Sequence, residues 1–220
     1  MGALTVYIII SFFSSFFFSV IFTVNLVYHV ATVGLDPLQL VLVGTILEGT
    51  VFLFEIPTGI VADLKSRRLS VIIGYLLIGL GFVIEGSFPF FAAVALGQGI
   101  WGFGYTFTSG AIQAWIVDEI GQARAEQAFL RGAQFRQFGA FLGIPLSVTL
   151  ASIAIPLPVI LGGVMMIFLS IFLIFAMPES GFKPTDAQER STWRSMLNTV
   201  KAARKMTIRQ PTLLIILVIG

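Results

Sequence analysis

The stretch VIIGYLLIGLGFV, residues 71–83, runs for thirteen positions without a charged side chain. Strands of a transmembrane β-barrel alternate polar and apolar positions, so a continuous run of this kind favours a helix. In hydrocarbon each backbone N–H must pair inside its own segment, which a helix achieves alone. Similar apolar runs surround this stretch, and we expect six membrane-spanning helices, at 4–28, 38–62, 69–87, 90–115, 132–153 and 157–177.

The composition of the chain is that of a polytopic, all-α membrane protein. Of its 220 residues, 57% are hydrophobic and 11% are charged, whereas soluble domains carry about 25% charged residues. This excludes an ordinary soluble enzyme, a disordered chain and a nucleic-acid-binding module. The chain has no cysteine and one histidine, so we expect no metal site and no cofactor. The first 30 residues lack lysine and arginine, so the first helix is predicted to be retained rather than cleaved as a signal peptide.

The basic residues predict how the helices cross the membrane. All 13 lysines and arginines follow the second, fourth or sixth predicted span, and the turns near 29–37, 87–89 and 154–156 hold none. Basic loops remain on the cytoplasmic side, so both ends of the six-helix unit, including the N-terminus, are predicted to be cytoplasmic. We expect a multi-pass protein of the bacterial cytoplasmic membrane.

The chain divides into three predicted parts: a six-helix bundle at 1–177, a cytoplasmic linker at 178–210 and the start of a seventh helix at 211–220. Apolar residues recur in the linker every three or four positions. This pattern suits either an amphipathic helix on anionic lipid or a solvated helix between two bundles. The apolar residues are Trp193, Met196, Leu197 and Val200. The run at 212–220 is too short to span a bilayer, so the seventh helix is expected to be truncated.

The loop after the second predicted span reads GIVADLKSRR, residues 59–68. It resembles the loop signature of the major facilitator superfamily, in which a glycine, an aspartate and closely spaced basic residues recur. Ser66 stands where that family has a second glycine. The resemblance implies a fold of two six-helix bundles and a gating loop whose charge relay holds the outward-open state. The implied gating residues are Gly59, Asp63, Lys65, Arg67 and Arg68.

The same loop residues have a direct physical interpretation. Gly59 would let a neighbouring helix approach closely. Asp63 lies at a helix C-terminus, where its charge opposes the helix dipole, so it requires a basic side chain or the N-terminus of another helix as a partner. On the residues alone, a basic turn that only fixes the topology is the alternative.

Two carboxylates lie within the second predicted span. Glu48 and Glu55 are seven residues apart, which places them near one helix face. A carboxylate in hydrocarbon is unfavourable unless it faces a partner or a cavity, so the pair indicates a water-lined pathway and is our candidate for proton coupling. The alternative is a protonated carboxyl bonded to a neighbouring helix. The run Glu-Ile-Pro-Thr-Gly at 55–59 resembles a drug-exporter-like subgroup of the superfamily, and Pro57 is expected to kink the helix.

The fourth predicted span carries the candidate substrate cavity, which consists of Gln98, Trp101, Tyr105 and Gln113. Aromatic rings stack on flat or cationic compounds, and the glycines of this span allow close packing or a smooth cavity wall. Set against the superfamily's motif on this helix, Gln98 stands where the drug/proton antiporters carry arginine. Glu85, near the outer end of the third span, is predicted to be an interface residue, and Trp115 is predicted to lie in the interfacial aromatic belt.

The fifth predicted span contains Gly139, Gly143 and Pro145, in a small-xxx-small pattern that predicts tight helix packing. It partly resembles the superfamily's exporter motif, although Ile144 separates the glycine from the proline here. The preceding loop, from 118 to 136, is predicted to form a short amphipathic cytoplasmic helix.

The resemblance implies the amino-terminal half of a secondary active transporter, with proton-coupled antiport of amphipathic, aromatic, drug-like molecules as in multidrug-resistance efflux. The implied partners are the lipid bilayer, a small-molecule substrate, the proton and a missing carboxy-terminal six-helix half, without nucleic acid. The chain alone is not expected to transport. Two alternatives stay open: a solute importer of the same fold, and a non-transporting partner or sensor subunit that works through 178–210. The sequence has neither a phosphate-binding lysine loop nor a nucleophile–base pair, so no enzymatic activity is expected.

Overall fold

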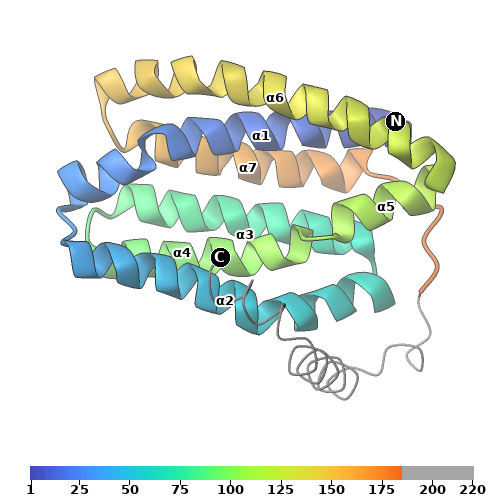
Figure 1. The fold of residues 1–220 in the computed structure, drawn as a ribbon, viewed down its shortest axis with the longest axis horizontal. Helices are drawn as coiled ribbons and strands as arrows, with labels where there is room; N and C mark the ends of the chain where they lie inside the picture. Colours follow the sequence, from blue (N-terminus) through green and yellow to red (C-terminus); the bar gives the residue numbers. More distant parts are fainter. Residues whose placement is uncertain (185–220) are drawn as a thin grey trace, which may run out of the picture. The chain divides into compact units, whose positions relative to one another are not determined.

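The structure is a computed structural model that describes residues 1–184, and all regular secondary structure within that range is helical (Figure 1). In chain order the elements are α1 (Ala3–Val27), the π-helix η1 (Tyr28–Val33), α2 (Pro37–Leu64), α3 (Arg67–Ser87), α4 (Phe91–Thr108), α5 (Ala111–Ile120), α6 (Gln122–Ile153) and α7 (Leu157–Ala176). Within the described residues, four segments are long and apolar enough to cross a membrane: α1 with η1, α2, α3 and α7. The fourth and fifth predicted spans correspond to α4 with α5 and to α6, and their crossing stays a prediction.

Two predicted boundaries are wrong. The fourth span, predicted to be one helix, is broken between α4 and α5 at Gly110, whose φ of 71° lies in the left-handed region that favours glycine. The short cytoplasmic helix predicted before the fifth span is instead continuous with it, because α6 runs for 32 residues from Gln122. The predicted linker helix and the start of the seventh helix lie outside the described residues, apart from 178–184, which contain no helix.

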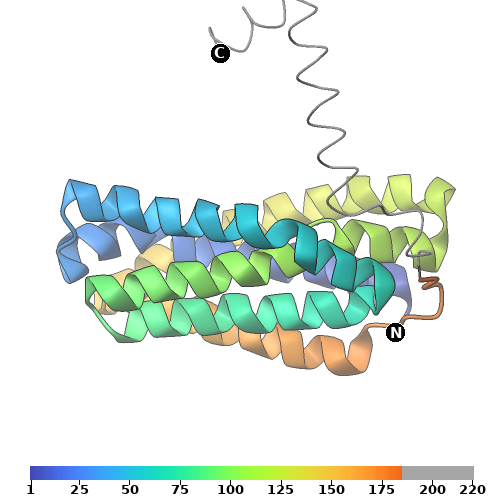
Figure 2. The same cartoon turned by 90° about the horizontal axis from the view of Figure 1, so that it is seen from below.

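The helices pack side by side in a defined series. It runs from α6 through α1, α7, α3 and α4 to α2, and Figure 1 shows this order from top to bottom. The view turned by 90° shows the same long helices lying along one another (Figure 2). Within the described residues, α2 and α6 therefore lie at the two ends of the series, and α3 and α7 lie inside it.

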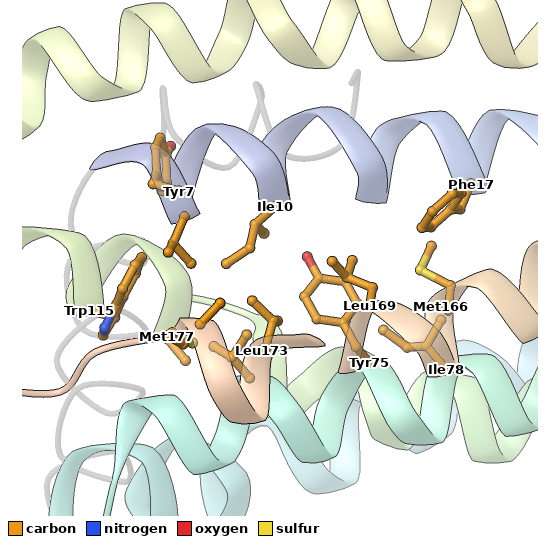
Figure 3. Packing of buried hydrophobic residues seen from close by; sticks show 14 of the residues in the cluster. Tyr7, Ile10, Phe17, Tyr75, Ile78, Trp115, Met166, Leu169, Leu173 and Met177 are labelled. Carbon is orange, nitrogen blue, oxygen red and sulfur yellow. The ribbon is translucent and has the colours of Figure 1, made fainter. Parts of the chain in front are cut away.

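The apolar core lies between α1, α3, α5 and α7. Side chains from these elements meet in Figure 3, among them Ile10, Tyr75, Trp115 and Leu173, all of which are buried. Trp115 is only 1% exposed, and its Nε1 donates a hydrogen bond of 2.7 Å to the carbonyl of Pro178. The predicted place of Trp115 in an interfacial belt is therefore wrong, because the ring is enclosed within the bundle.

Glycines let neighbouring backbones approach closely inside the bundle. A Cβ added at Gly79 in α3 would lie 2.6 Å from the carbonyl oxygen of Gly163 in α7. On α6, an added Cβ at Gly139 would meet the carbonyl oxygen of Phe12, and one at Gly143 would lie 2.6 Å from that of Phe16. Only a residue without a side chain fits at these points, so the contacts of α6 with α1 depend on its glycines.

Gly59 makes no such close contact with a neighbouring helix in the described residues. An added Cβ there would meet no atom within 4 Å, so the close helix approach predicted at Gly59 is not found. Pro57 and Pro145 lie inside α2 and α6, and each helix continues through its proline.

Candidate functional site

The long helix α2 presents most of its surface outward. Only 6% of its most apolar window is buried, against 56% for the corresponding window of α3. Glu48 and Glu55 are both exposed on α2, in the company of large apolar side chains such as Phe52 and Val41. Within the described residues, the two predicted coupling carboxylates therefore lie on a largely uncovered helix face.

Helix α4 lies directly against α2 at the level of these carboxylates. The carbonyl of Leu47, one residue before Glu48, would lie 3.3 Å from a Cβ at Gly102 of α4. About two turns after Gly102, at the C-cap of α4, the hydroxyl of Ser109 donates a hydrogen bond of 3.2 Å to Glu55 Oε1. Because Gly102 has no side chain, α2 can sit close to α4, and the two carboxylates are brought beside the candidate cavity helix.

Three of the four predicted cavity residues lie on open or half-open surface. Tyr105 and Gln113 are exposed, and Trp101 is half-buried. The Trp101 ring stacks on Phe82 of α3, with 5.5 Å between ring centroids and 23° between planes, and it meets Tyr105 edge-on at 6.2 Å. The half-buried Trp101 ring and the exposed Tyr105 ring therefore form an aromatic surface on α4 that is backed by the buried Phe82, and such a surface suits flat apolar or cationic compounds.

The fourth cavity residue, Gln98, lies elsewhere. It is 5% exposed, and its Nε2 donates a hydrogen bond of 2.7 Å to Glu85 Oε2. Asn25 and His29 bond to the other oxygen of the same carboxyl group. Gln98 therefore lines a buried polar cluster, and its connection to the open surface is the bond that its Oε1 accepts from Trp101 Nε1, at 2.8 Å.

The cluster of Asn25, His29, Glu85 and Gln98 was not predicted from the sequence. Glu85 was predicted to be an interface residue, and His29, as the one histidine, served only to exclude a metal site. The available signal was topological: Glu85 lies near the end of the third predicted span and His29 follows the first, so both lie at the end of the bundle predicted to be outside. The sequence therefore predicts that the two side chains lie at a similar depth in the membrane, but it does not predict that they contact each other.

The predicted gating loop is held by a partly buried charge network. Arg67, in the first turn of α3, contacts Asp118 of α5 with one guanidinium nitrogen, and its other terminal nitrogen lies 3.6 Å from Asp63 Oδ1. Burial raises the pKa of the Asp118 carboxyl above its ordinary value, and the nearby Arg67 charge only partly offsets this. The guanidinium thus joins α2, α3 and α5, while Lys65 is exposed.

The segment after α7 is fastened to the same loop. Glu179 accepts hydrogen bonds from Ser66 Oγ at 2.7 Å and from the backbone N–H of Arg68 at 2.9 Å. Ser66 is also the N-cap of α3, because its Oγ accepts the N–H of Leu69 at 2.8 Å. Gly181 completes the attachment by donating its N–H to Glu119, at 2.7 Å. The loop is therefore held from α5 and from the start of the predicted linker.

The chain resembles known membrane transporters. The family model of the Major Facilitator Superfamily matches residues 7–220. The uncharacterized MFS-type transporter YxaM of Bacillus subtilis (strain 168) is 23% identical over 188 residues, which make up 84% of this chain and 46% of that protein. The crystal structure of a peptide transporter, POT, in complex with sulfate has the same fold, with a TM-score of 0.67 and 20% identity over 93% of this chain and 45% of that one. The chain thus spans about half the length of the relatives that it matches.

Proposed function

The chain belongs to the major facilitator superfamily, and from this premise we propose that it forms the amino-terminal half of a secondary active transporter. The proposed activity is export of amphipathic, aromatic small molecules in exchange for protons. A second bundle of six helices completes the substrate path, since the matched relatives are about twice as long. The proposed location is the bacterial cytoplasmic membrane, with the N-terminus inside, as the placement of the basic residues indicates.

The observation that carries this proposal is the uncovered face of α2 beside the aromatic surface of α4. Glu48 and Glu55 are exposed on a helix whose other exposed side chains are largely apolar. Such carboxylates are unfavourable against lipid, so this face is expected to meet water or a second bundle. Ser109 binds Glu55 and follows Tyr105 by one turn, which brings a titratable group and an aromatic ring to one side of the bundle.

In the proposed cycle, Glu48 and Glu55 exchange protons with the cavity, and Trp101, Tyr105 and Gln113 contact the substrate. Protonation removes a negative charge from the cavity wall, and this charge otherwise attracts a cationic aromatic compound. Proton binding and substrate binding then oppose each other, as exchange requires.

The loop at Asp63, Arg67 and Arg68 serves as the proposed gate. Arg67 holds the end of α2 to α5, so a movement of one helix pair relative to the other must break or rearrange these contacts. Gly59 contributes to the gate only through the second bundle, because no described atom lies close to it.

The test measures accumulation of ethidium in vesicles that contain the intact transporter, with and without a pH gradient. We expect gradient-driven accumulation in the direction of export. Glu48→Gln should abolish the dependence on the gradient while leaving ethidium exchange across the membrane intact. Glu126→Gln is the matched control, because Glu126 is exposed on α6, away from α2. Gradient dependence that survives Glu48→Gln would remove Glu48 from the coupling role.

Two further outcomes bear on the proposal. Counterflow in oriented vesicles distinguishes export from import, and accumulation toward the cytoplasmic side would contradict export. Transport by the purified 220-residue chain alone would contradict its role as half of the pathway. A sensor or partner subunit would show neither exchange nor accumulation in the intact form.

A further inference from the structure

One carboxyl group is fully buried at the end of the bundle opposite the gating loop. Glu85, near the C-terminal end of α3, is 0% exposed. Its Oε1 lies 2.7 Å from His29 Nε2 of η1 and 3.1 Å from Asn25 Nδ2 of α1. Its Oε2 lies 2.7 Å from Gln98 Nε2 of α4. Side chains from the first span, α1 with η1, and from α4 are therefore directed at one acid, which is more than helix packing requires.

The partners of Glu85 suit two protonation states. The amides of Asn25 and Gln98 donate to it, as an ionised carboxylate requires. Asn25 Oδ1 is buried and accepts no hydrogen bond from any described residue. An amide can turn over, so this oxygen is available as the acceptor for a protonated Glu85. The His29 ring can either donate to the carboxylate or accept from the protonated acid, depending on its tautomer.

The backbone around the cluster is shaped to bring these groups together. The π-helix η1 widens the end of the first span at Tyr28 and His29, and such turns occur frequently at functional sites. On the other side, Gly97 of α4 fits against α3 so closely that an added Cβ would lie 2.9 Å from Glu85 Cβ. This close approach places the neighbouring Gln98 within hydrogen-bond distance of the acid.

A hydrogen-bond chain links the acid to the candidate substrate surface. Gln98 Oε1 accepts from Trp101 Nε1 at 2.8 Å, and the Trp101 ring meets Tyr105. While Glu85 is ionised, Gln98 must direct its NH₂ group toward the acid and its oxygen toward Trp101. When Glu85 is protonated, the amide can reverse, and Trp101 Nε1 then loses its acceptor. The protonation state of Glu85 thereby changes the hydrogen bonding of Trp101 at the aromatic surface.

We propose that Glu85 and His29 together form a proton-binding site for coupling, in addition to Glu48, and that Gln98 connects it to Trp101. This inference rests on the proposed transport function. The pair binds one proton, which changes its net charge from −1 to zero. A buried negative charge without a counter-ion is unfavourable, so the proton is held while the site is closed and leaves when parting helices admit water.

Among residues 1–184, His29 is the one basic side chain within ion-pair distance of Glu85. The titratable groups facing it are His29 and Tyr28 of η1, and the Tyr28 hydroxyl donates to the Glu85 carbonyl at 2.6 Å. Helices α1 and α4 contribute the amides. The α7 residues that approach the neighbouring Gly86 are Val159 and Ile160, which are apolar. Proton binding therefore depends on the Glu85–His29 pair and not on a wider charge network.

The test compares Glu85→Gln with Glu126→Gln in vesicles that contain the intact transporter. We expect Glu85→Gln to retain ethidium counterflow, which needs no net proton movement, and to reduce pH-gradient-driven accumulation to the level without a gradient. Gradient-driven accumulation equal to the wild type overturns this inference and leaves the proposed function standing. Absence of counterflow in the wild type instead overturns the proposed function. Accumulation driven by a sodium gradient and not by a pH gradient also overturns the inference.

A second variant and a spectroscopic measurement keep the test decisive if Glu85→Gln does not fold. His29→Gln keeps a donor toward Glu85 but removes the titratable ring, and it should also lose gradient-driven accumulation; wild-type accumulation overturns the proposal. His29 is the one histidine of the 220-residue sequence, so ¹⁵N-histidine labelling of this chain gives ring-nitrogen signals from a single imidazole. The ring signals should shift in Glu85→Gln, because the ring loses its hydrogen bond to the carboxylate, and unchanged signals overturn the proposal.

Discussion

Arg67 shows how one side chain can connect several elements. Its planar guanidinium presents separate nitrogens to two carboxylates, and in this structure these are Asp118 and Asp63. Both acids are at least partly withdrawn from water, as is the arginine itself. The arrangement leaves Asp118 with a raised pKa because burial outweighs the attraction of Arg67. The contact between α3 and α5 is thus sensitive to acid on the side of the membrane where the basic loops lie.

This sensitivity gives a prediction for Asp118→Asn. A carboxyl whose folded pKa is raised binds its proton more tightly in the folded state, so its contribution to stability is present at low pH and is lost as pH rises through that pKa. We therefore expect wild-type protein to gain thermal stability relative to Asp118→Asn as the pH falls from 7 toward the ordinary carboxyl value of 3.8. The measurement is the melting temperature of both proteins in detergent at several pH values. If the difference in melting temperature between the two proteins stays constant or reverses as the pH falls, the attraction of Arg67 outweighs the effect of burial on Asp118.

At the scale of elements, α3 is the helix around which its neighbours pack. Its glycines face two partners: Gly74 and Gly81 lie against α4, and Gly79 lies against α7. At each of these positions an added Cβ would come within 3 Å of a backbone atom of the partner helix. Backbone cannot move aside as a flexible side chain can, so any side chain here must push two helices apart.

Gly79→Ala is accordingly expected to destabilise the bundle by about 1–3 kcal/mol, the range found for overpacked cores. Gly49→Ala, in α2, is the matched control, because an added Cβ there would meet no atom within 4 Å. The measurement is thermal unfolding of both variants in the same detergent. Equal melting temperatures for the two variants would mean that α3 and α7 can move apart without a loss of stability.

The segment after α7 behaves as an extension of the bundle. Glu179 binds the loop before α3 through Ser66 and Arg68, and Lys183 lies exposed just beyond. Glu179→Ala removes both acceptor oxygens, so we expect faster chymotrypsin cleavage after Phe182 in membranes, detected by mass spectrometry of the fragments. Glu126→Ala, which changes an exposed carboxyl on α6, should leave the cleavage rate unchanged. Equal rates for all three proteins would show that this attachment does not order the segment.

The helices could be predicted from the sequence more closely than the contacts between them. Hydrophobic runs depend on local composition, so the predicted spans 69–87 and 157–177 differ by at most two residues from α3 and α7. The break at Gly110 was missed because glycine is also common within membrane helices, and only its backbone angle distinguishes it. The pair of His29 and Glu85 was missed because its residues are 56 positions apart, and a distant contact leaves no local pattern.

At the scale of the whole molecule, the helix contacts repeat. Helix α1 packs against α6 and α7, and α4 packs in the corresponding way against α2 and α3, while α3 and α7 pack against each other. This is the pattern expected when the first three spans and the next three are related as an inverted repeat. The helices at the two ends of the series, α2 and α6, each contain one internal proline, at Pro57 and Pro145. The repeat leaves α2 and α6 with faces that a second bundle can cover.

The orientation of this bundle in the membrane can be measured directly, because the chain contains no cysteine. Lys65 and Phe88 are both exposed and lie at opposite ends of α3. Since basic loops remain cytoplasmic, Lys65→Cys should react with a membrane-impermeant maleimide only after the cells are opened. Phe88→Cys, in a turn without lysine or arginine, should react in intact cells. The reverse labelling would place the gating loop outside, and the Glu85–His29 cluster would then take its proton from the cytoplasm, so the proposed direction of exchange would be wrong.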